Sequence, residues 1–113
     1  MGDKVPGKGV VTYGLRAVNA QRRIHELAQD TGNIVWTHHI RARMEERGID
    51  ADAVLRVLRG GDVEEEPTEA DVPGDWKVKI VLKLGTGRVA GVALVLMQSN
   101  RLVLMTAEWE DRR

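Results

Sequence analysis

Residues 76–84 read WKVKIVLKL, and this stretch decides the fold. Every second side chain from Trp76 to Leu84 is apolar, and three of the four side chains between them are lysines. A period of two predicts a β-strand that buries one face and exposes the other. We therefore expect the second half of the chain to be built around a half-buried strand.

Two further strands are predicted after this one. The Gly85-Thr86-Gly87 turn leads into residues 88–98, which are apolar on both faces and so predict a central strand. Ser99-Asn100 then turns into a last strand over residues 101–109. A short acidic strand is expected before the lysine-bearing one, at residues 62–66. The pattern predicts an antiparallel meander of three or four strands.

The segment before Gly61 repeats its apolar residues with helical spacing. Helices are expected over residues 14–30, 38–47 and 51–59, and the last two should form a tight helical hairpin. The residues expected to cap them are Thr37 and Asp50 at helix starts, and Gly48 and Gly60-Gly61 at helix ends. Side chains expected in the core are Trp36, Ile40, Met44, Leu55, Leu58, Ile80, Leu82, Val95 and Leu104. The predicted class is α+β, with N-terminal helices packed on one face of the sheet.

Composition and charge limit the class of protein. With 113 residues, 42% of them hydrophobic, the chain can build one core, so residues 13–113 are expected to form a single domain after a flexible tail at 1–12. Seventeen basic residues balance seventeen acidic ones, which argues against coating nucleic acid through bulk charge. The absence of cysteine excludes disulfides and thiol catalysis.

Two further expectations concern location and cofactors. The longest apolar run, residues 92–97, is far too short to cross a membrane, so a soluble, cytoplasmic protein is expected. The three histidines lack the spacing of a metal site, because adjacent residues on a helix diverge by ~100°. We therefore expect neither a metal nor another cofactor.

The densest chemistry lies in THHIRARMEERGI, residues 37–49. His39, Arg43 and Arg47 follow one another at steps of four, so their side chains lie on one helical stripe ~80° wide. The helix would then present an imidazole and two guanidiniums together, which suits a phosphate group or an RNA backbone. The same pattern is typical of a solvated basic helix face.

Residues 39–49 also follow the pattern H-x-x-x-R-M-x-x-R-G-[IV]. With the acidic segment at 61–64 and the meander behind it, the chain resembles a widespread, largely uncharacterised domain family of small bacterial proteins grouped with the BrnT and RelE-like toxins. The resemblance covers residues 34–109. It implies a compact RelE-like α+β fold, RNA cleavage that is ribosome-dependent or free, and neutralisation by a partner antitoxin.

Metal-independent RNA cleavage needs a base for the 2′-hydroxyl and a cation at the phosphate. His39 suits the first role, because the start of a helix and Arg43 both favour a neutral imidazole that accepts a proton. Arg43 and Arg47 suit the second role, and Glu46 or Glu66 are alternative bases. The cations expected to extend the phosphate-binding track are Lys77, Lys79 and Lys83.

Each of these residues also has a structural interpretation. A histidine at a helix start often bonds a loop carbonyl, and alternating lysines often protect a strand from edge pairing. Carboxylates able to neutralise Arg43 and Arg47 occur at Glu46, Asp50 and 64–66. A second class of function therefore stays open: a non-catalytic module that binds protein or nucleic acid. The neutral net charge favours this module, and the stripe favours an RNA-cleaving enzyme.

Overall fold

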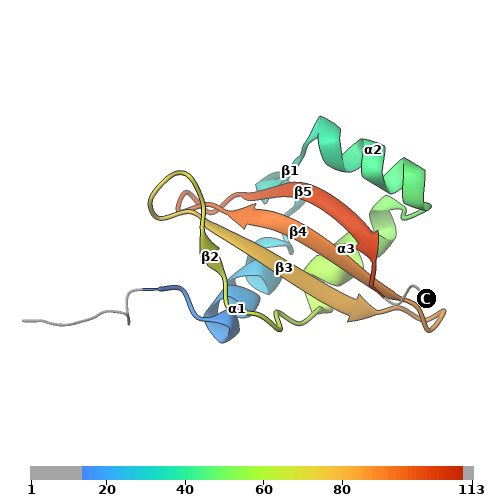
Figure 1. Cartoon of the computed structure of the whole chain (residues 1–113), viewed down its shortest axis with the longest axis horizontal. Coiled ribbons are helices and arrows are strands. Elements are labelled where there is room, and N and C mark those ends of the chain that lie inside the picture. Colours follow the sequence, from blue (N-terminus) through green and yellow to red (C-terminus); the bar gives the residue numbers. More distant parts are fainter. Residues whose placement is uncertain (1–13, 111–113) are drawn as a thin grey trace, which may run out of the picture.

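The computed structural model describes residues 14–110, and the tail predicted at 1–12 lies outside them. Within the described part, three α-helices and a five-stranded mixed sheet form an α+β fold (Figure 1). The strands lie in the order β1-β5-β4-β3-β2. The elements along the chain are α1 (Ala17–Leu27), the 3-10 turn η2 (Thr31–Asn33), β1 (Ile34–Trp36), α2 (His38–Arg47), α3 (Ala51–Gly60), β2 (Thr68–Glu69), β3 (Trp76–Lys83), β4 (Val89–Leu96) and β5 (Leu102–Trp109).

The centre of the sheet is the predicted antiparallel meander. β3 pairs with β4 along the whole length of both strands, and β4 pairs with β5. The second pairing contains a β-bulge, since Ala93 lies opposite Thr106 whereas Leu94 lies opposite Leu104. Met105 is therefore left without an opposite residue.

The sheet differs from the predicted three or four antiparallel strands in two places. β1 runs parallel to β5, with Ile34 opposite Leu102. This strand was not predicted, because its three residues are too few to show a periodicity in the sequence. The strand predicted at 62–66 is wrong, because this segment joins the sheet through one isolated bridge between Asp62 and Val81. Three successive glutamates and the following proline oppose strand pairing, and the short β2 forms after them.

The predicted limits of α2 are confirmed, and α3 begins as predicted and ends one residue later, at Gly60. The caps of the two helices explain where they begin. Thr37 Oγ1 accepts a hydrogen bond from the Ile40 N–H at 3.1 Å, and Asp50 Oδ1 accepts one from the Ala53 N–H at 2.8 Å. Gly48 ends α2 in the left-handed conformation with φ of 68°.

No helix within residues 14–110 is long and apolar enough to span a lipid bilayer.

Two of the three helices pack as predicted, and the third does not. α1 and α3 contact each other, and α3 covers β3 and β4, so these two helices lie on one face of the sheet as expected. α2 instead packs along β5 at the edge of the sheet (Figure 1). The hairpin predicted for α2 and α3 is therefore wrong, because the two helices diverge after Gly48 and bind different strands.

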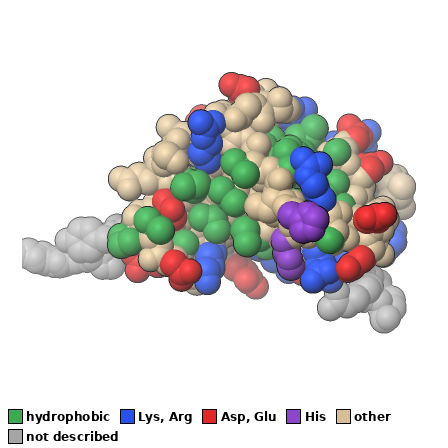
Figure 2. Space-filling model, turned by 90° about the horizontal axis from the view of Figure 1, so that it is seen from above, with side chains coloured by type: hydrophobic (Ala, Val, Ile, Leu, Met, Phe, Trp, Pro, Cys, Tyr) green, Lys and Arg blue, Asp and Glu red, His purple; other side chains and the backbone are tan. Residues whose placement is uncertain are grey.

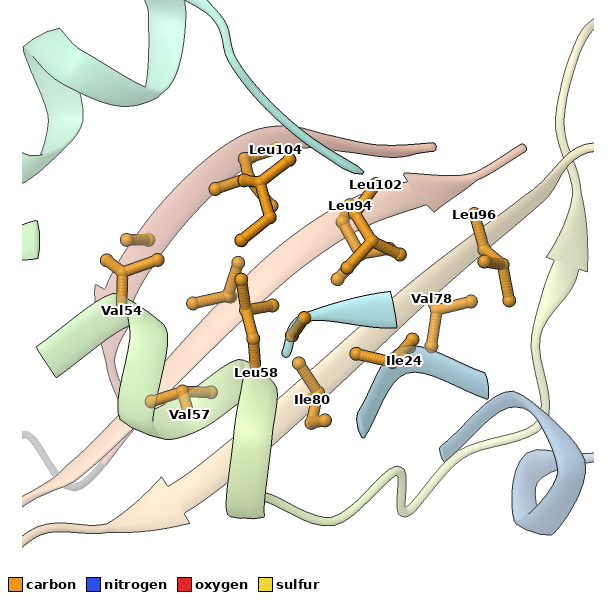
Figure 3. Close-up of a cluster of buried hydrophobic side chains, with 14 of the residues drawn as sticks. Ile24, Val54, Val57, Leu58, Val78, Ile80, Leu94, Leu96, Leu102 and Leu104 are labelled. Atoms are coloured by element: carbon orange, nitrogen blue, oxygen red, sulfur yellow. The ribbon is translucent and has the colours of Figure 1, made fainter. Parts of the chain in front are cut away.

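The core lies between the sheet and the helices α1 and α3 (Figure 3). Of the side chains predicted to be buried, Ile40, Leu58, Ile80 and Leu104 are fully buried. Those that are partly buried against the core are Trp36, Met44, Leu55 and Leu82. The prediction for Val95 is wrong, because this side chain is half-buried on the other face of the sheet. β4 is apolar on both faces, so its sequence does not indicate which face the helices cover.

Replacing Gly48 by valine should lower the free energy of unfolding by about 1–2 kcal/mol, because only glycine adopts its left-handed backbone without strain. A Cβ atom at Gly48 would meet nothing within 4 Å, so the cost comes from the backbone alone. Gly60 is the matched control, since a Cβ there also meets nothing within 4 Å and its φ is not left-handed. Chemical denaturation should show a change within about 0.5 kcal/mol for Gly60→Val. Equal losses in both variants would contradict this explanation.

Candidate functional site

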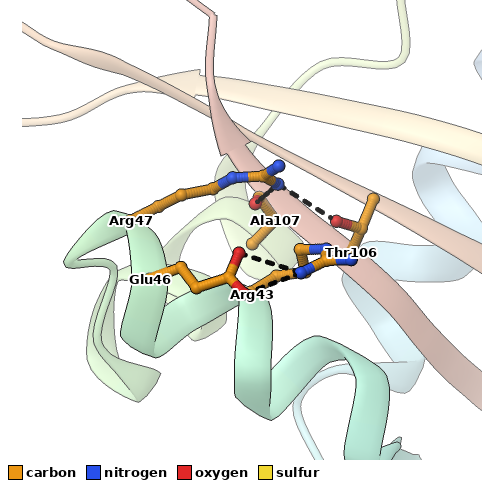
Figure 4. A network of polar contacts seen from close by, with 5 residues as sticks. All are labelled: Arg43, Glu46, Arg47, Thr106 and Ala107. Carbon is orange, nitrogen blue, oxygen red and sulfur yellow. Dashed lines mark hydrogen bonds and ion pairs between the residues drawn. The ribbon is translucent and has the colours of Figure 1, made fainter.

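α2 is fixed along the part of β5 that β1 leaves unpaired. β1 accompanies β5 only as far as Leu104, and Thr37 Oγ1 donates a hydrogen bond to the Leu104 carbonyl at 2.6 Å. At the other end of α2, Arg47 Nη1 donates to the Ala107 carbonyl at 2.8 Å (Figure 4). Trp109 Nε1 donates to the Arg47 carbonyl at 2.7 Å. The helix thus takes the place of a neighbouring strand and covers the edge of β5.

The stripe of His39, Arg43 and Arg47 runs along one side of this helix, and its last member, Arg47, reaches the backbone of β5. His39 and Arg47 are exposed and Arg43 is half-buried, whereas Ile40 on the adjoining side is fully buried. Within residues 14–110, His39 has no hydrogen-bond or ion-pair partner, so its imidazole is open to a ligand. Figure 2 shows histidine and basic side chains close together at one end of an area of apolar side chains.

The two arginines of the stripe have different partners. Arg43 Nη1 contacts both carboxylate oxygens of Glu46, at 2.8 and 2.9 Å, so its charge is partly balanced (Figure 4). Arg47 Nη1 bonds the Ala107 carbonyl and lies 3.3 Å from Thr106 Oγ1. Both partners that Arg47 has within residues 14–110 are neutral, so this guanidinium is held in place and no carboxylate among those residues balances its charge.

The lysines of β3 do not join the stripe. Lys77, Lys79 and Lys83 alternate with the buried side chains of β3, and therefore lie on the sheet face turned away from α1 and α3. β4 and β5 separate them from α2. Lys79 is also engaged, since its Nζ lies 2.8 Å from Glu110 Oε1 and 3.3 Å from Glu108 Oε2. The structure thus separates the two parts of the predicted phosphate track.

The ion pairs of Lys79 form a link between β3 and the end of β5. Burial alone would lower the pKa of Lys79, but the hydrogen bonds and charges of Glu110 and Glu108 outweigh it, and the pKa is raised. The second carboxylate oxygen of Glu110 is buried and has no hydrogen-bond partner within the described residues. We interpret this cluster as structural.

Glu66, one of the two alternative bases, serves the start of α1. Its Oε1 accepts a hydrogen bond from the Ala17 N–H at 3.0 Å and lies 3.6 Å from Arg16 Nε. The residue at the cap position, Arg16, makes no side-chain cap of its own, so Glu66 takes over this role from a distant segment. α1 and α2 lie on different sides of the molecule (Figure 1), so Glu66 is remote from the stripe.

Thr106 and Trp109 complete the surroundings of α2, and the sequence did not predict this role for them. They lie 59 and 62 residues from Arg47 along the chain, so no local spacing connects them with the helix.

Within residues 14–110, no group of three or more His, Asp or Glu side chains is placed to hold a metal ion.

The chain belongs to the family described as Domain of unknown function (DUF4258), whose model matches residues 36–109. The match includes all of α2 and the three long strands, and it leaves out α1. No curated protein and no solved structure matches the chain. Membership of this family therefore fixes no activity.

The Lys79 ion pairs predict a loss of stability at high pH. Because the folded-state pKa is raised, protonated Lys79 stabilises the fold below its ordinary pKa of 10.5, and this contribution is lost as the pH rises through the folded value. Denaturant unfolding should show a steeper fall in stability above about pH 10 for the wild type than for Lys79→Gln. Lys77→Gln, an exposed position on the same strand, should keep the wild-type slope. Parallel curves for the wild type and Lys79→Gln would rule out this role.

Proposed function

We propose that this protein is of the toxin–antitoxin type and acts on RNA through the exposed stripe of α2. One observation carries the proposal: the imidazole of His39, which has no partner within residues 14–110, lies on the same helical stripe as two guanidiniums, one paired with Glu46 of the same helix and one bonded to β5. Guanidiniums bind phosphate oxygens with paired donors, and an imidazole can accept the proton of a ribose hydroxyl. The three side chains together suit an RNA backbone.

Arg47 provides the stronger attraction for phosphate. Its partners, the Thr106 hydroxyl and the Ala107 carbonyl, are neutral, whereas Arg43 is paired with the carboxylate of Glu46. Both bonds of Arg47 use Nη1, so the donors on Nη2 and Nε remain for a ligand. A guanidinium that is already held in place loses less conformational entropy when it binds.

In the catalytic form of the proposal, the chain cleaves RNA without a metal. His39 takes the proton of the 2′-hydroxyl while the 2′-oxygen attacks the adjacent phosphorus, and the 5′-oxygen leaves with a proton from solvent. Arg43 and Arg47 balance the negative charge that develops on the phosphate oxygens. Glu46 orients Arg43 in this scheme and does not serve as the base.

A non-catalytic binding module is the second candidate, and the Arg43–Glu46 ion pair favours it. That pair reduces the positive charge beside His39, and the three lysines of β3 lie on another surface. The chain also has a net charge of zero, which limits its affinity for RNA away from the stripe. In this form the stripe docks a protein or a nucleic acid and no bond is broken.

The toxin proposal also implies partners and a location. A toxin of this type acts in the cytoplasm on RNA or on the ribosome, and a partner antitoxin holds it inactive. These expectations rest on the resemblance of residues 39–49 to the BrnT and RelE-like group. An antitoxin that neutralises the protein would have to cover or displace the exposed stripe of α2.

Substitutions on the stripe separate binding from cleavage. His39→Ala should slow RNA cleavage by about 100-fold or more and leave RNA affinity within about twofold, because it removes proton transfer and no cation. Arg43→Ala and Arg47→Ala should weaken both. Gel electrophoresis with and without ribosomes measures cleavage, and fluorescence anisotropy at several salt concentrations measures binding. Expression of the wild type should slow bacterial growth, and His39→Ala should not.

The control is Arg41→Ala, an exposed cation on the same helix that points ~160° away from Arg43. It should change neither cleavage nor affinity. Thermal melts of Arg47→Ala are needed beside the assays, because this residue also holds α2 on β5. RNA binding without cleavage would support the binding module. A wild-type protein that neither binds nor cleaves RNA, with or without ribosomes, would disprove the proposal.

A further inference from the structure

The sheet face turned away from α1 and α3 carries a groove of about 440 Å³. The apolar side chains of its floor are Ala93 and Val95 from β4 and Met105 from β5. Met105 is 40% exposed and is the residue that the β-bulge leaves without an opposite residue. A concave apolar surface with an exposed methionine is typical of a docking site, since methionine adapts its shape to a partner.

One wall of the groove is strongly acidic. It comes from residues 62–71, which contain six acidic residues and no basic one. Glu65, Glu66 and Asp71 line the groove. Glu66 is paired with Arg16, whereas Glu65 and Asp71 are exposed and have no ion pair within residues 14–110. The wall therefore presents uncompensated negative charge beside the apolar floor.

The lysines that also line the groove cancel only part of this charge. Lys79 is balanced by Glu108 and Glu110, with which it forms ion pairs. Lys77 is the other lysine of the groove, and its single positive charge offsets one of the two negative charges of Glu65 and Asp71. The groove thus combines an apolar floor with a rim on which negative charge prevails.

We propose that this groove binds a basic amphipathic helix of a partner protein. The apolar side of such a helix would cover Ala93, Val95 and Met105, and its lysine or arginine side chains would pair with Glu65 and Asp71. The opposite sheet face is already covered by α1 and α3, so a helix in the groove would cover the second face in the same way. This site is separate from the α2 stripe and does not depend on the RNA proposal.

Charge and shape disfavour the other occupants. Phosphate groups would be repelled by the acidic wall, so RNA does not suit the groove. A second copy of the chain offers no matching helix within residues 14–110: of its exposed large apolar side chains, Val18 alone lies on a helix. A partner helix of opposite charge is the occupant that satisfies both the floor and the wall.

Two synthetic helices test this proposal on the full-length protein. One is an amphipathic peptide of leucine and lysine with leucines at helical spacing, and the other carries glutamate in place of every lysine. Amide chemical shifts of the labelled protein should change at Thr68, Ala93, Val95 and Met105 with the lysine peptide. The glutamate peptide should cause no such changes.

Charge reversal and a matched control identify the acidic wall. The double variant Glu65→Lys, Asp71→Lys should weaken binding of the lysine peptide by at least about tenfold. Glu26→Lys reverses an exposed charge on α1 and should leave affinity unchanged. Met105→Gln should weaken binding by about threefold or more, and Val18→Gln should not. All these positions are exposed, and the amide spectra report whether each variant is folded.

Several outcomes would overturn the inference. These are equal affinity for the two peptides, shifts centred on α2, or binding that survives the reversal at Glu65 and Asp71. Shifts in the groove that grow with protein concentration and without peptide would assign it to a second copy. Shifts in the groove on adding single-stranded RNA would assign it to nucleic acid.

Discussion

The contact between α2 and the edge of β5 is the constraint on which the rest of the structure depends. Hydrogen bonds from Thr37, Arg47 and Trp109 hold the helix where β1 ends, so a strand edge that would otherwise be open is covered. This contact turns Ile40 inward and leaves His39 exposed. The same interaction therefore stabilises the sheet and presents the stripe.

Charge in this chain is separated in space, although its sum is zero. The positive side chains of α2 lie beyond β5, and the acidic segment 62–71 lies beyond β3, at opposite sides of the sheet order. The cations of the stripe and the carboxylates of the acidic wall therefore belong to two separate surfaces. Net charge alone argues against an anionic ligand, but the separation allows one to bind at α2 and a cationic partner to bind in the groove.

Features set by neighbouring residues could be predicted from the sequence. The caps at Thr37 and Asp50, the left-handed Gly48 and the alternation of β3 all follow from short-range chemistry. Features set by distant residues could not. Glu66 caps α1 across 49 residues, and β1 is stabilised by a strand at the other end of the chain. The spacing of the stripe was local and predictable, whereas its anchoring on β5 was not.

The most direct test of the α2 surface is an NMR titration of the labelled full-length protein with short single-stranded RNA. We expect amide shifts at residues 38–47 and at Thr106 and Ala107, where α2 meets β5. These shifts should weaken as salt is raised, because phosphate contacts release counterions. Shifts confined to other surfaces, or a spectrum that RNA does not change, would contradict this account. The stripe would then be a structural feature of the sheet edge and would not be an RNA-binding site.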